Sequence, residues 1–140
     1  MGEEMERKIK QLKEAKEIAA LGGGREKIEK LHQKGKLSAR ERINLLIDPG
    51  SFIEWNMLIG HEQGLPTEGI ISGYGTVDGR GMCVYSQDST ILGGSIGVFH
   101  GYKMYRTIER ALEMRVPLIG LHDSPGARTA RLEEGGGALG

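Results

Sequence analysis

The sequence predicts an α/β fold in which a charged helical segment precedes a glycine-rich domain. Apolar residues recur at helical spacing through the first third of the chain. Two alternating segments flank Asp78-Gly79, and the apolar run Val116–Leu121 follows a long amphipathic segment. Of the 23 glycines, 17 lie from Gly60 onward, which indicates tight turns or close backbone approaches there. We therefore expect a helical arm over residues 1–47 and an α/β domain over residues 48–140.

The N-terminal arm is expected to form three helices. The first ends at Gly22-Gly23-Gly24, because glycine suits the left-handed backbone that follows a helix. A second, short helix ends near Gly35. Ser38 and Glu41 form a capping box for a third helix, which Asp48-Pro49-Gly50 ends. We expect this arm to serve packing or oligomerisation rather than catalysis, through a face of the first helix that contains Met5, Ile9, Leu12, Ala15, Ile18 and Ala19.

The most specific local pattern is a β-hairpin. The segments Glu68–Val77 and Gly81–Gln87 alternate in polarity, and Asp78-Gly79 between them is typical of a type I′ turn. Before the hairpin, residues 52–59 are expected to form a strand or an extended arm, and residues 61–66 a loop.

After the hairpin, the pattern predicts one long helix and one buried strand. The strand Val116–Leu121 runs into a loop of mostly small residues, His122–Ala127, and residues 129–134 are expected to start another helix. A helix followed by a strand begins a βαβ-type repeat. A sheet with so few strands indicates the front part of a longer or a split protein. The long helix is predicted from the apolar positions Val98, Tyr102, Tyr105, Ile108 and Leu112.

Composition excludes several classes of function. Acids and bases balance at 19 each, so net charge gives no support to nucleic-acid binding. Cys83 is the sole cysteine, which excludes a disulfide or cysteine-based metal site within the chain and suits a reducing compartment. The four histidines show no metal-ligand spacing, and we expect no metal. Without a membrane-spanning run or a secretory signal, the expected location is the cytoplasm.

Two glycine-rich loops are the candidate sites, Leu92–Gly97 and Ser124–Arg128. Loops at the carboxyl ends of strands are where α/β proteins usually bind ligands, and small residues let peptide N–H groups reach a substrate. The chemistry this favours is stabilisation of an oxyanion, or a cradle for a thioester or phosphate. Arg128 supplies a permanent cation suited to a phosphate or carboxylate. The alternative is that both loops only allow tight packing of backbone on backbone.

Other motifs are excluded or carry less weight. Gly73 and Gly75 resemble part of a dinucleotide fingerprint, but they lie within a hairpin rather than before a helix. Ser124, His122 and Asp123 are neighbours on one extended loop, which disfavours a catalytic triad. Asp88 and Asp123 each follow a predicted strand and are expected to brace loops rather than act as a catalytic pair.

Four ordered blocks resemble one family, the carboxyltransferase component of biotin-dependent acyl-CoA carboxylases, such as the propionyl-CoA carboxylase β subunit. Related decarboxylase subunits share the pattern. The blocks are KLSARERINLLIDPGSFIEW (Lys36–Trp55), GIISGYGTVDGRGMCVYSQDSTILGGSIG (Gly69–Gly97), the helix over residues 98–114, and VPLIGLHDSPGAR (Val116–Arg128).

The resemblance implies a crotonase-like fold of ββα repeats, here incomplete and preceded by N-terminal helices. The implied reaction moves a carboxyl group between carboxybiotin and the α-carbon of an acyl-CoA, and the cofactor supplies the base. Partners would be a biotin carboxyl carrier and a biotin carboxylase, in a homo-oligomer that is a hexamer in the family. The implied oxyanion donors are the amides of Gly126 and Ala127, and the implied substrate-binding residues are Gly93, Gly94, Ser95, Ser124 and Arg128.

Two departures from the family pattern bear on the substrate. Pro125 stands where the family has the first glycine of Asp-Ser-Gly-Gly-Ala-Arg, and proline has no N–H to donate. Residues 129–135 are longer than the family's Ile-Gln-Glu-Gly. Two alternatives stay open: a decarboxylase subunit that runs the transfer in reverse, and a non-catalytic assembly module. We expect no turnover from these 140 residues alone.

Overall fold

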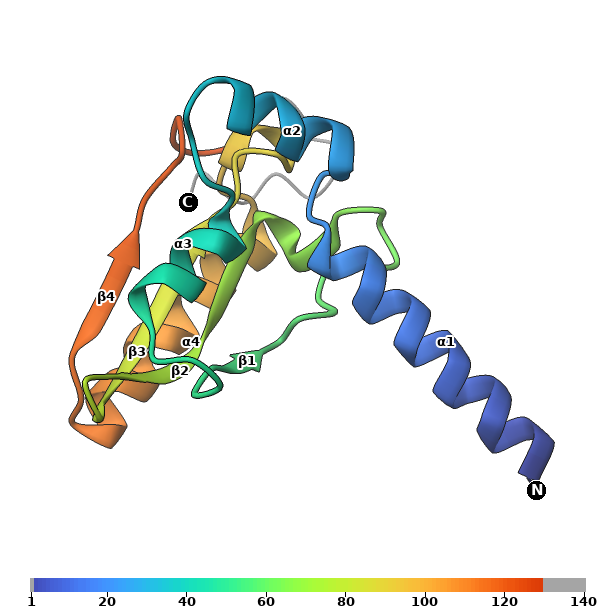
Figure 1. Ribbon diagram of the computed structural model, residues 1–140, viewed down its shortest axis with the longest axis horizontal. Coiled ribbons are helices and arrows are strands. Elements are labelled where there is room, and N and C mark those ends of the chain that lie inside the picture. The colour runs from blue at the N-terminus through green and yellow to red at the C-terminus, as the bar shows by residue number, and fades with distance from the viewer. Residues whose placement is uncertain (1, 130–140) are drawn as a thin grey trace.

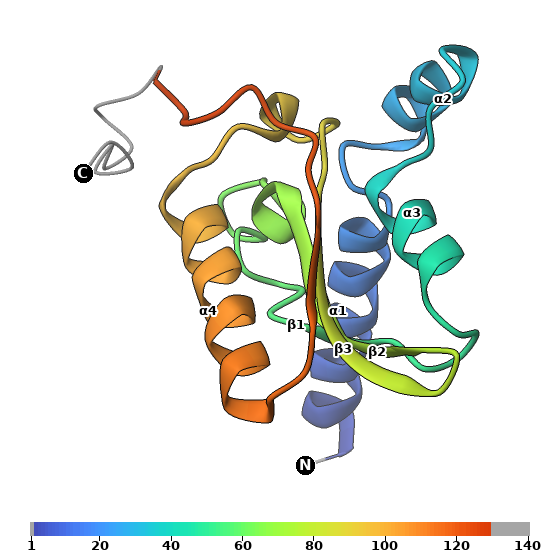
Figure 2. The same ribbon diagram turned by 90° about the vertical axis from the view of Figure 1, so that its left-hand side faces the viewer.

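The computed structural model describes residues 2–129 and arranges them as a mixed sheet between helices (Figures 1 and 2). The sheet has the order β1-β2-β3-β4; its first three strands are antiparallel, and β4 runs parallel to β3. The strands are β1 (Ile53–Trp55), β2 (Ile70–Val77), β3 (Arg80–Gln87) and β4 (Leu118–Leu121). The helices are α1 (Gly2–Ala20), α2 (Arg25–Gln33), α3 (Ala39–Leu46) and α4 (Val98–Met114), with 3-10 turns η1 (Pro66–Gly69) and η2 (Leu92–Gly94).

The three N-terminal helices form where they were predicted. The capping box is confirmed: the hydroxyl of Ser38 accepts from the amide of Glu41 at 3.2 Å, and the Glu41 carboxylate accepts from the Ser38 amide at 3.2 Å. Gly22, two residues after the end of α1, takes a left-handed φ of 54°. Helix α1 projects from the rest of the molecule (Figure 1), and only Ala15 and Ala19 of its apolar face are buried.

The predicted hairpin is also confirmed. Strands β2 and β3 pair from Ile70 opposite Gln87 to Val77 opposite Arg80. Asp78 and Gly79 have φ values of 51° and 78°, the two positive angles that a type I′ turn needs. The predicted extended segment before the hairpin contributes only the three residues of β1 to the sheet.

One aspartate outside the hairpin fixes its turn. The carboxylate of Asp48 accepts hydrogen bonds from the amides of Asp78 and Gly79 at 3.0 and 2.9 Å, and from the Thr76 hydroxyl at 2.6 Å. These bonds, that of Thr76 first, hold the pKa of the Asp48 carboxyl below its usual value. The residue that ends α3 in the sequence pattern therefore also secures the hairpin.

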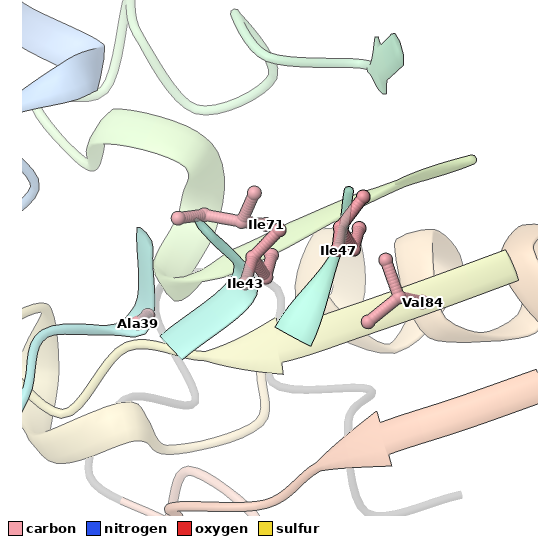
Figure 3. Packing of buried hydrophobic residues seen from close by; sticks show 5 residues of the cluster. All are labelled: Ala39, Ile43, Ile47, Ile71 and Val84. Carbon is pink, nitrogen blue, oxygen red and sulfur yellow. The ribbon is translucent and has the colours of Figure 1, made fainter. Parts of the chain in front are cut away.

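The hydrophobic core lies between α3 and the sheet (Figure 3). Leu46, Phe52, Ile119 and Leu121 pack around it, so strands β2, β3 and β4 all contribute to this face. Helix α3 is thus part of the sheet domain's core, although it belongs to the segment predicted as an arm. The boundary at residue 47 stays a prediction. The buried cluster consists of Ala39, Ile43, Ile47, Ile71 and Val84.

Helix α4 covers the opposite face of the sheet (Figure 2), but not with the side that its apolar pattern predicted. The residues of α4 that are buried against the rest of the protein are polar or small: His100, Lys103, Thr107 and Ala111. The predicted apolar positions Val98, Tyr102, Tyr105, Ile108 and Leu112 are all exposed within the described chain. An apolar stripe identifies the side of a helix that is suited to packing, but it does not say which neighbour packs against that side.

Strand β4 differs from the expected buried strand. It pairs with β3 on one edge, and no other strand within residues 2–129 pairs with its second edge. Its residues alternate in exposure, with Leu118 and Gly120 exposed and Ile119 and Leu121 half-buried toward the core. The helix predicted to start within residues 129–134, and most of the longer 129–135 segment, lie outside the described residues.

Candidate functional site

The two glycine-rich loops lie side by side at one end of the sheet (Figures 1 and 2). Ile96 and Ala127 form a parallel bridge, in which the Ile96 amide donates to the Gly126 carbonyl at 2.9 Å and the Arg128 amide donates to the Ile96 carbonyl at 2.8 Å. A Cβ on Gly94 would lie 2.2 Å from the Asp123 carbonyl oxygen. The close approach of the loops therefore requires glycine at position 94.

The two predicted donor amides differ in their surroundings. The Gly126 amide donates to the Ser124 hydroxyl at 3.0 Å. Ala127 directs its own N–H away from Ile96, because a residue bridged in this way in a parallel ladder turns its peptide groups to the other side. Ala127 is exposed, and its amide has no hydrogen-bond partner within residues 2–129.

Gly126 gives the loop its shape. Its φ of 115° lies in a region that L-residues rarely adopt, and a Cβ there would meet no atom within 4 Å. Pro125 precedes it and restricts Ser124 to extended backbone. The glycine is thus needed for its backbone angle, and the space beside it is open. Gly93, at φ 68° on the facing loop, also borders open space.

Arg128 is held inside the protein rather than presented to a ligand. Its Nη1 donates to Glu68 Oε1 at 2.7 Å, its Nε to Ser95 Oγ at 3.2 Å and its Nη2 to the Ser95 carbonyl at 3.1 Å. The Arg128 side chain is 14% exposed and that of Glu68 is 3% exposed. In turn, the Ser95 hydroxyl donates to the Leu92 carbonyl at 2.7 Å. Arg128 and Ser95 therefore brace the two loops against each other.

Buried polar side chains lie beneath these loops. Gln87 Oε1 accepts from the Asp123 amide at 2.9 Å, Gln87 Nε2 lies 3.3 Å from His100 Nε2, and His100 Nδ1 lies 3.0 Å from the Glu68 carbonyl oxygen. Burial, above all, lowers the pKa of His100 to about 4. The ring is therefore neutral at pH 7.

A buried lysine supports the turn that carries Glu68. Lys103 Nζ donates to the carbonyls of Thr67, at 2.9 Å, and Ile70. Its burial lowers the pKa of the Lys103 amine to about 8. Thr67 and Glu68 have φ values of 58° and 53°, which non-glycine residues rarely adopt, so the carbonyl contacts of Lys103 and His100 secure a strained turn.

Sequence reasoning did not single out Glu68, Gln87 or His100. Glu68 was placed at the start of a strand, because no local pattern predicts a left-handed turn at Thr67-Glu68. His100 falls on the polar side of an amphipathic helix, which ordinarily faces water. The signal that was available is the spacing of His100, Lys103 and Thr107, which places all three on one helical face.

The disfavoured Ser-His-Asp triad does not form within the described residues. His122 Nε2 lies 2.8 Å from the Tyr85 hydroxyl, and Ser124 bonds to Gly126, so no hydrogen bond joins Ser124, His122 and Asp123. Asp88 braces its loop as expected, because its carboxylate accepts from the amide and the hydroxyl of Thr90. Residues 2–129 contain no cluster of three or more His, Cys, Asp or Glu side chains suited to a metal ion.

A pocket of about 390 Å³ lies beside η2. Its walls come from the end of α1 and the Gly22–Gly24 turn, from the segment Gly64–Pro66 that leads into η1, and from Thr90–Leu92. Lys27 lines the pocket and lies within 3.4 Å of the Thr90 carbonyl oxygen. The pocket thus combines apolar walls with one cation.

In the described part of the chain, no helix has both the length and the apolar character needed to cross a membrane.

Comparison with known families decides the relationship. Residues 30–140 match the model of the carboxyl transferase domain. The chain belongs to the carboxyl transferase family. The resemblance seen in the four sequence blocks is therefore confirmed.

Curated relatives of this carboxyl transferase chain include a decarboxylase subunit and a carboxylase chain. The methylmalonyl-CoA decarboxylase subunit alpha of Propionigenium modestum is 42% identical over 130 residues, which cover 87% of this chain and 25% of that protein. The propionyl-CoA carboxylase beta chain of Roseobacter denitrificans is 41% identical over 128 residues, covering 86% of this chain and 25% of that protein. The chain thus spans about a quarter of the length of these relatives.

Solved structures confirm the predicted crotonase-like carboxyltransferase fold. The transcarboxylase 12S hexamer, solved with methylmalonyl-CoA and methylmalonic acid bound, has a TM-score of 0.85 at 38% identity and covers 96% of this chain and 27% of its own. The geranyl-CoA carboxylase beta subunit of P. aeruginosa has a TM-score of 0.70 at 32% identity, covering 94% and 24%.

Proposed function

We propose that this chain forms the acyl-CoA side of a carboxyltransferase site, in which the amide of Ala127 stabilises the thioester oxygen. The transferred group is a carboxyl, exchanged between carboxybiotin on a partner protein and the α-carbon of an acyl-CoA. The observation that carries the proposal is the N–H of the exposed residue Ala127, which points away from its bridge to Ile96 and has no partner within residues 2–129. Family membership supports the reaction class.

Carboxyl transfer to an acyl-CoA requires a hydrogen-bond donor of this kind. When the α-carbon gains electron density during transfer, negative charge develops on the thioester oxygen. A fixed peptide N–H aimed at that oxygen stabilises the charge, and one such donor contributes roughly 10²–10³ in rate. When bound, carboxybiotin supplies the carboxyl group and the base. The loop residues Ser124–Arg128 include no acid or neutral base, which suits a site whose protein groups need only orient and stabilise.

The two loops give the substrate an approach. Gly93 and Gly126 border open space, so a thioester can come close to the backbone there, while Gly94 lets the loops meet. Ser124 holds the Gly126 amide, and Ser95 and Arg128 brace the loops; we assign these three to shaping the site rather than to direct contact with CoA. The pocket beside η2, with Lys27 in its wall, is our candidate for the CoA portion, because a cation suits its phosphates.

We expect the partner proteins to indicate the direction of carboxyl transfer. The same oxyanion serves carboxylation and decarboxylation, and the methylmalonyl-CoA decarboxylase relative keeps the reverse transfer as the second candidate. A biotin carboxylase and a carrier protein as partners would indicate the forward direction, and a membrane sodium pump the reverse. We expect a cytoplasmic homo-oligomer, and the 12S hexamer is the supporting precedent. Because the chain spans a quarter of its relatives, we expect activity only from the complete protein.

One substitution removes the proposed donor without removing a group that forms the bridge hydrogen bonds. Ala127→Pro deletes the N–H, whereas the bridge uses only the Gly126 carbonyl and the Arg128 amide. In the complete enzyme we expect kcat for carboxyl transfer to fall about 10²–10³-fold. Ala127→Val retains the N–H and should remain near wild type. A folded Ala127→Pro enzyme that binds acyl-CoA and transfers the carboxyl group at the wild-type rate would overturn the proposal.

A further inference from the structure

We infer that Gln87 and His100 are positioning residues that hold the Asp123–Ala127 loop in its productive shape. They form a buried chain of side-chain hydrogen bonds from the Asp123 amide to the Glu68 carbonyl. The inference rests on the proposed function, because it concerns the loop that carries the Ala127 donor. Both residues are almost fully buried, so neither is assigned a direct role in the reaction.

The orientation of Gln87 follows from its partners. It is the last residue of β3 and is 1% exposed. The Asp123 amide donates to Gln87 Oε1 at 2.9 Å, so the other end of the side-chain amide is the donor, Nε2. Nε2 points to His100 Nε2 at 3.3 Å. A glutamine at the end of one strand thus fixes the backbone just beyond the neighbouring parallel strand, β4.

The tautomer of His100 follows in the same way. His100 is fully buried, and its Nδ1 lies 3.0 Å from the Glu68 carbonyl oxygen, which can only accept. Nδ1 therefore carries the proton, and Nε2 is left as the acceptor for the Gln87 amide. The direction of every hydrogen bond in the chain is consistent. The lowered pKa of His100 agrees with a neutral ring.

Glu68 connects this series of hydrogen bonds to the other end of the Asp123–Ala127 loop. Its carbonyl accepts from His100, and its carboxylate binds the guanidinium of Arg128, the residue after Ala127. The loop is therefore attached at Asp123 and at Arg128 to the same buried group. Between these two points lie Pro125 and Gly126, which make no hydrogen bond to that group within the described residues. Moving either attachment would change the direction of the Ala127 N–H.

A double-substitution experiment distinguishes a positioning role of Gln87 from a purely structural one, because only a positioning role makes its effect depend on the Ala127 donor. Gln87→Met in the complete enzyme keeps the side chain's length but removes the bond to the Asp123 amide. If Gln87 acts through the loop, kcat should fall about tenfold to a hundredfold, with KM for acyl-CoA little changed. In the background of Ala127→Pro the same substitution should have almost no further effect, because the donor that it positions is already gone.

Controls separate folding from positioning. Thr107→Val removes another buried polar contact of α4, to the Lys103 carbonyl, and should lower the melting temperature without lowering kcat. If Gln87→Met does not fold, His100→Asn serves as the second variant: it retains a donor for the Glu68 carbonyl but loses the acceptor for Gln87. Its kcat should fall, with greater hydrogen exchange at residues 122–128.

The outcomes separate the two proposals. A normal rate for Ala127→Pro would refute the proposed function. A slow Ala127→Pro enzyme beside wild-type rates for Gln87→Met and His100→Asn would refute the positioning role alone. Independent multiplication of the Gln87→Met and Ala127→Pro effects would also refute it.

Discussion

The guanidinium of Arg128 lies 2.7 Å from the carboxylate of Glu68, although the two residues are 60 positions apart in the chain. This ion pair joins the loop after β4 to the strained η1 turn. Both side chains are largely buried, so each charge depends on the other for compensation. The residue that sequence reasoning offered as a ligand for phosphate or carboxylate is thus paired within the protein.

Removing one partner of this pair should be costly. Arg128→Met leaves the buried Glu68 carboxylate without its cation, and we expect the free energy of unfolding to fall by about 3 kcal/mol. The double variant Arg128→Met with Glu68→Gln should recover part of that loss, because the uncompensated charge is gone. Denaturant unfolding of the wild type, the two single variants Arg128→Met and Glu68→Gln, and the double variant measures both effects. Equal stability of Arg128→Met and wild type would show that the pair is not a brace.

Gly94 should be needed where the two loops meet. A Cβ on Gly94 would lie 2.2 Å from the Asp123 carbonyl oxygen. Gly94→Ala should therefore separate the loops and lower kcat for carboxyl transfer at least tenfold. Gly35→Ala is the control, because Gly35 also has positive φ but lies in the N-terminal segment, where a Cβ would meet nothing within 4 Å, and it should cost only about 1 kcal/mol of stability. Equal kcat values for the two variants would contradict the close loop contact.

Gly126 should be needed for its backbone angle. Gly126→Val meets no steric obstacle but cannot easily adopt φ 115°, so we expect the loop to change shape and kcat to fall at least tenfold. Gly50→Val is the control, because Gly50 also has positive φ and open space but lies far from the loops in sequence and outside the site. Steady-state kinetics on both folded enzymes tests this. A Gly126→Val enzyme as active as Gly50→Val would argue against the loop's role.

The neutral state of His100 makes a prediction about acid stability. Its pKa falls from 6.5 to about 4 on folding, so between those values the unfolded chain binds the extra proton. The stabilisation is fully present above pH 6.5 and is lost as the pH falls toward 4, by roughly 3 kcal/mol in total. His100→Asn should remove this part of the pH dependence. The measurement is unfolding between pH 4 and 7, and identical pH slopes for the two proteins would contradict the assignment.

How far the sequence predicts this structure depends on whether a feature is local. The Asp78-Gly79 turn and the Ser38–Glu41 capping box were predictable because a few neighbouring residues determine each. The outward apolar face of α4 was not, because periodicity does not say which neighbour covers a face. The exposed edge of β4 was missed for a similar reason.

The candidate site also has a part that the sequence predicts and a part that it does not. The two glycine-rich loops were found from composition and family resemblance. The support beneath them was not found, because Glu68, Gln87 and His100 are brought together only by the fold. The left-handed angles at Thr67 and Glu68 have no glycine to signal them. Sequence patterns therefore identified the two candidate loops, whereas the structure was needed for the residues that hold them.

The most direct test of the account is the structure of the complete enzyme with an unreactive acyl-CoA analogue bound. The distance to measure joins the thioester oxygen, or the atom that replaces it, to the Ala127 amide nitrogen. We predict about 3 Å, with the N–H pointing at the oxygen. A bound analogue whose oxygen lies beyond hydrogen-bond reach of Ala127, held by other donors, would contradict the central claim.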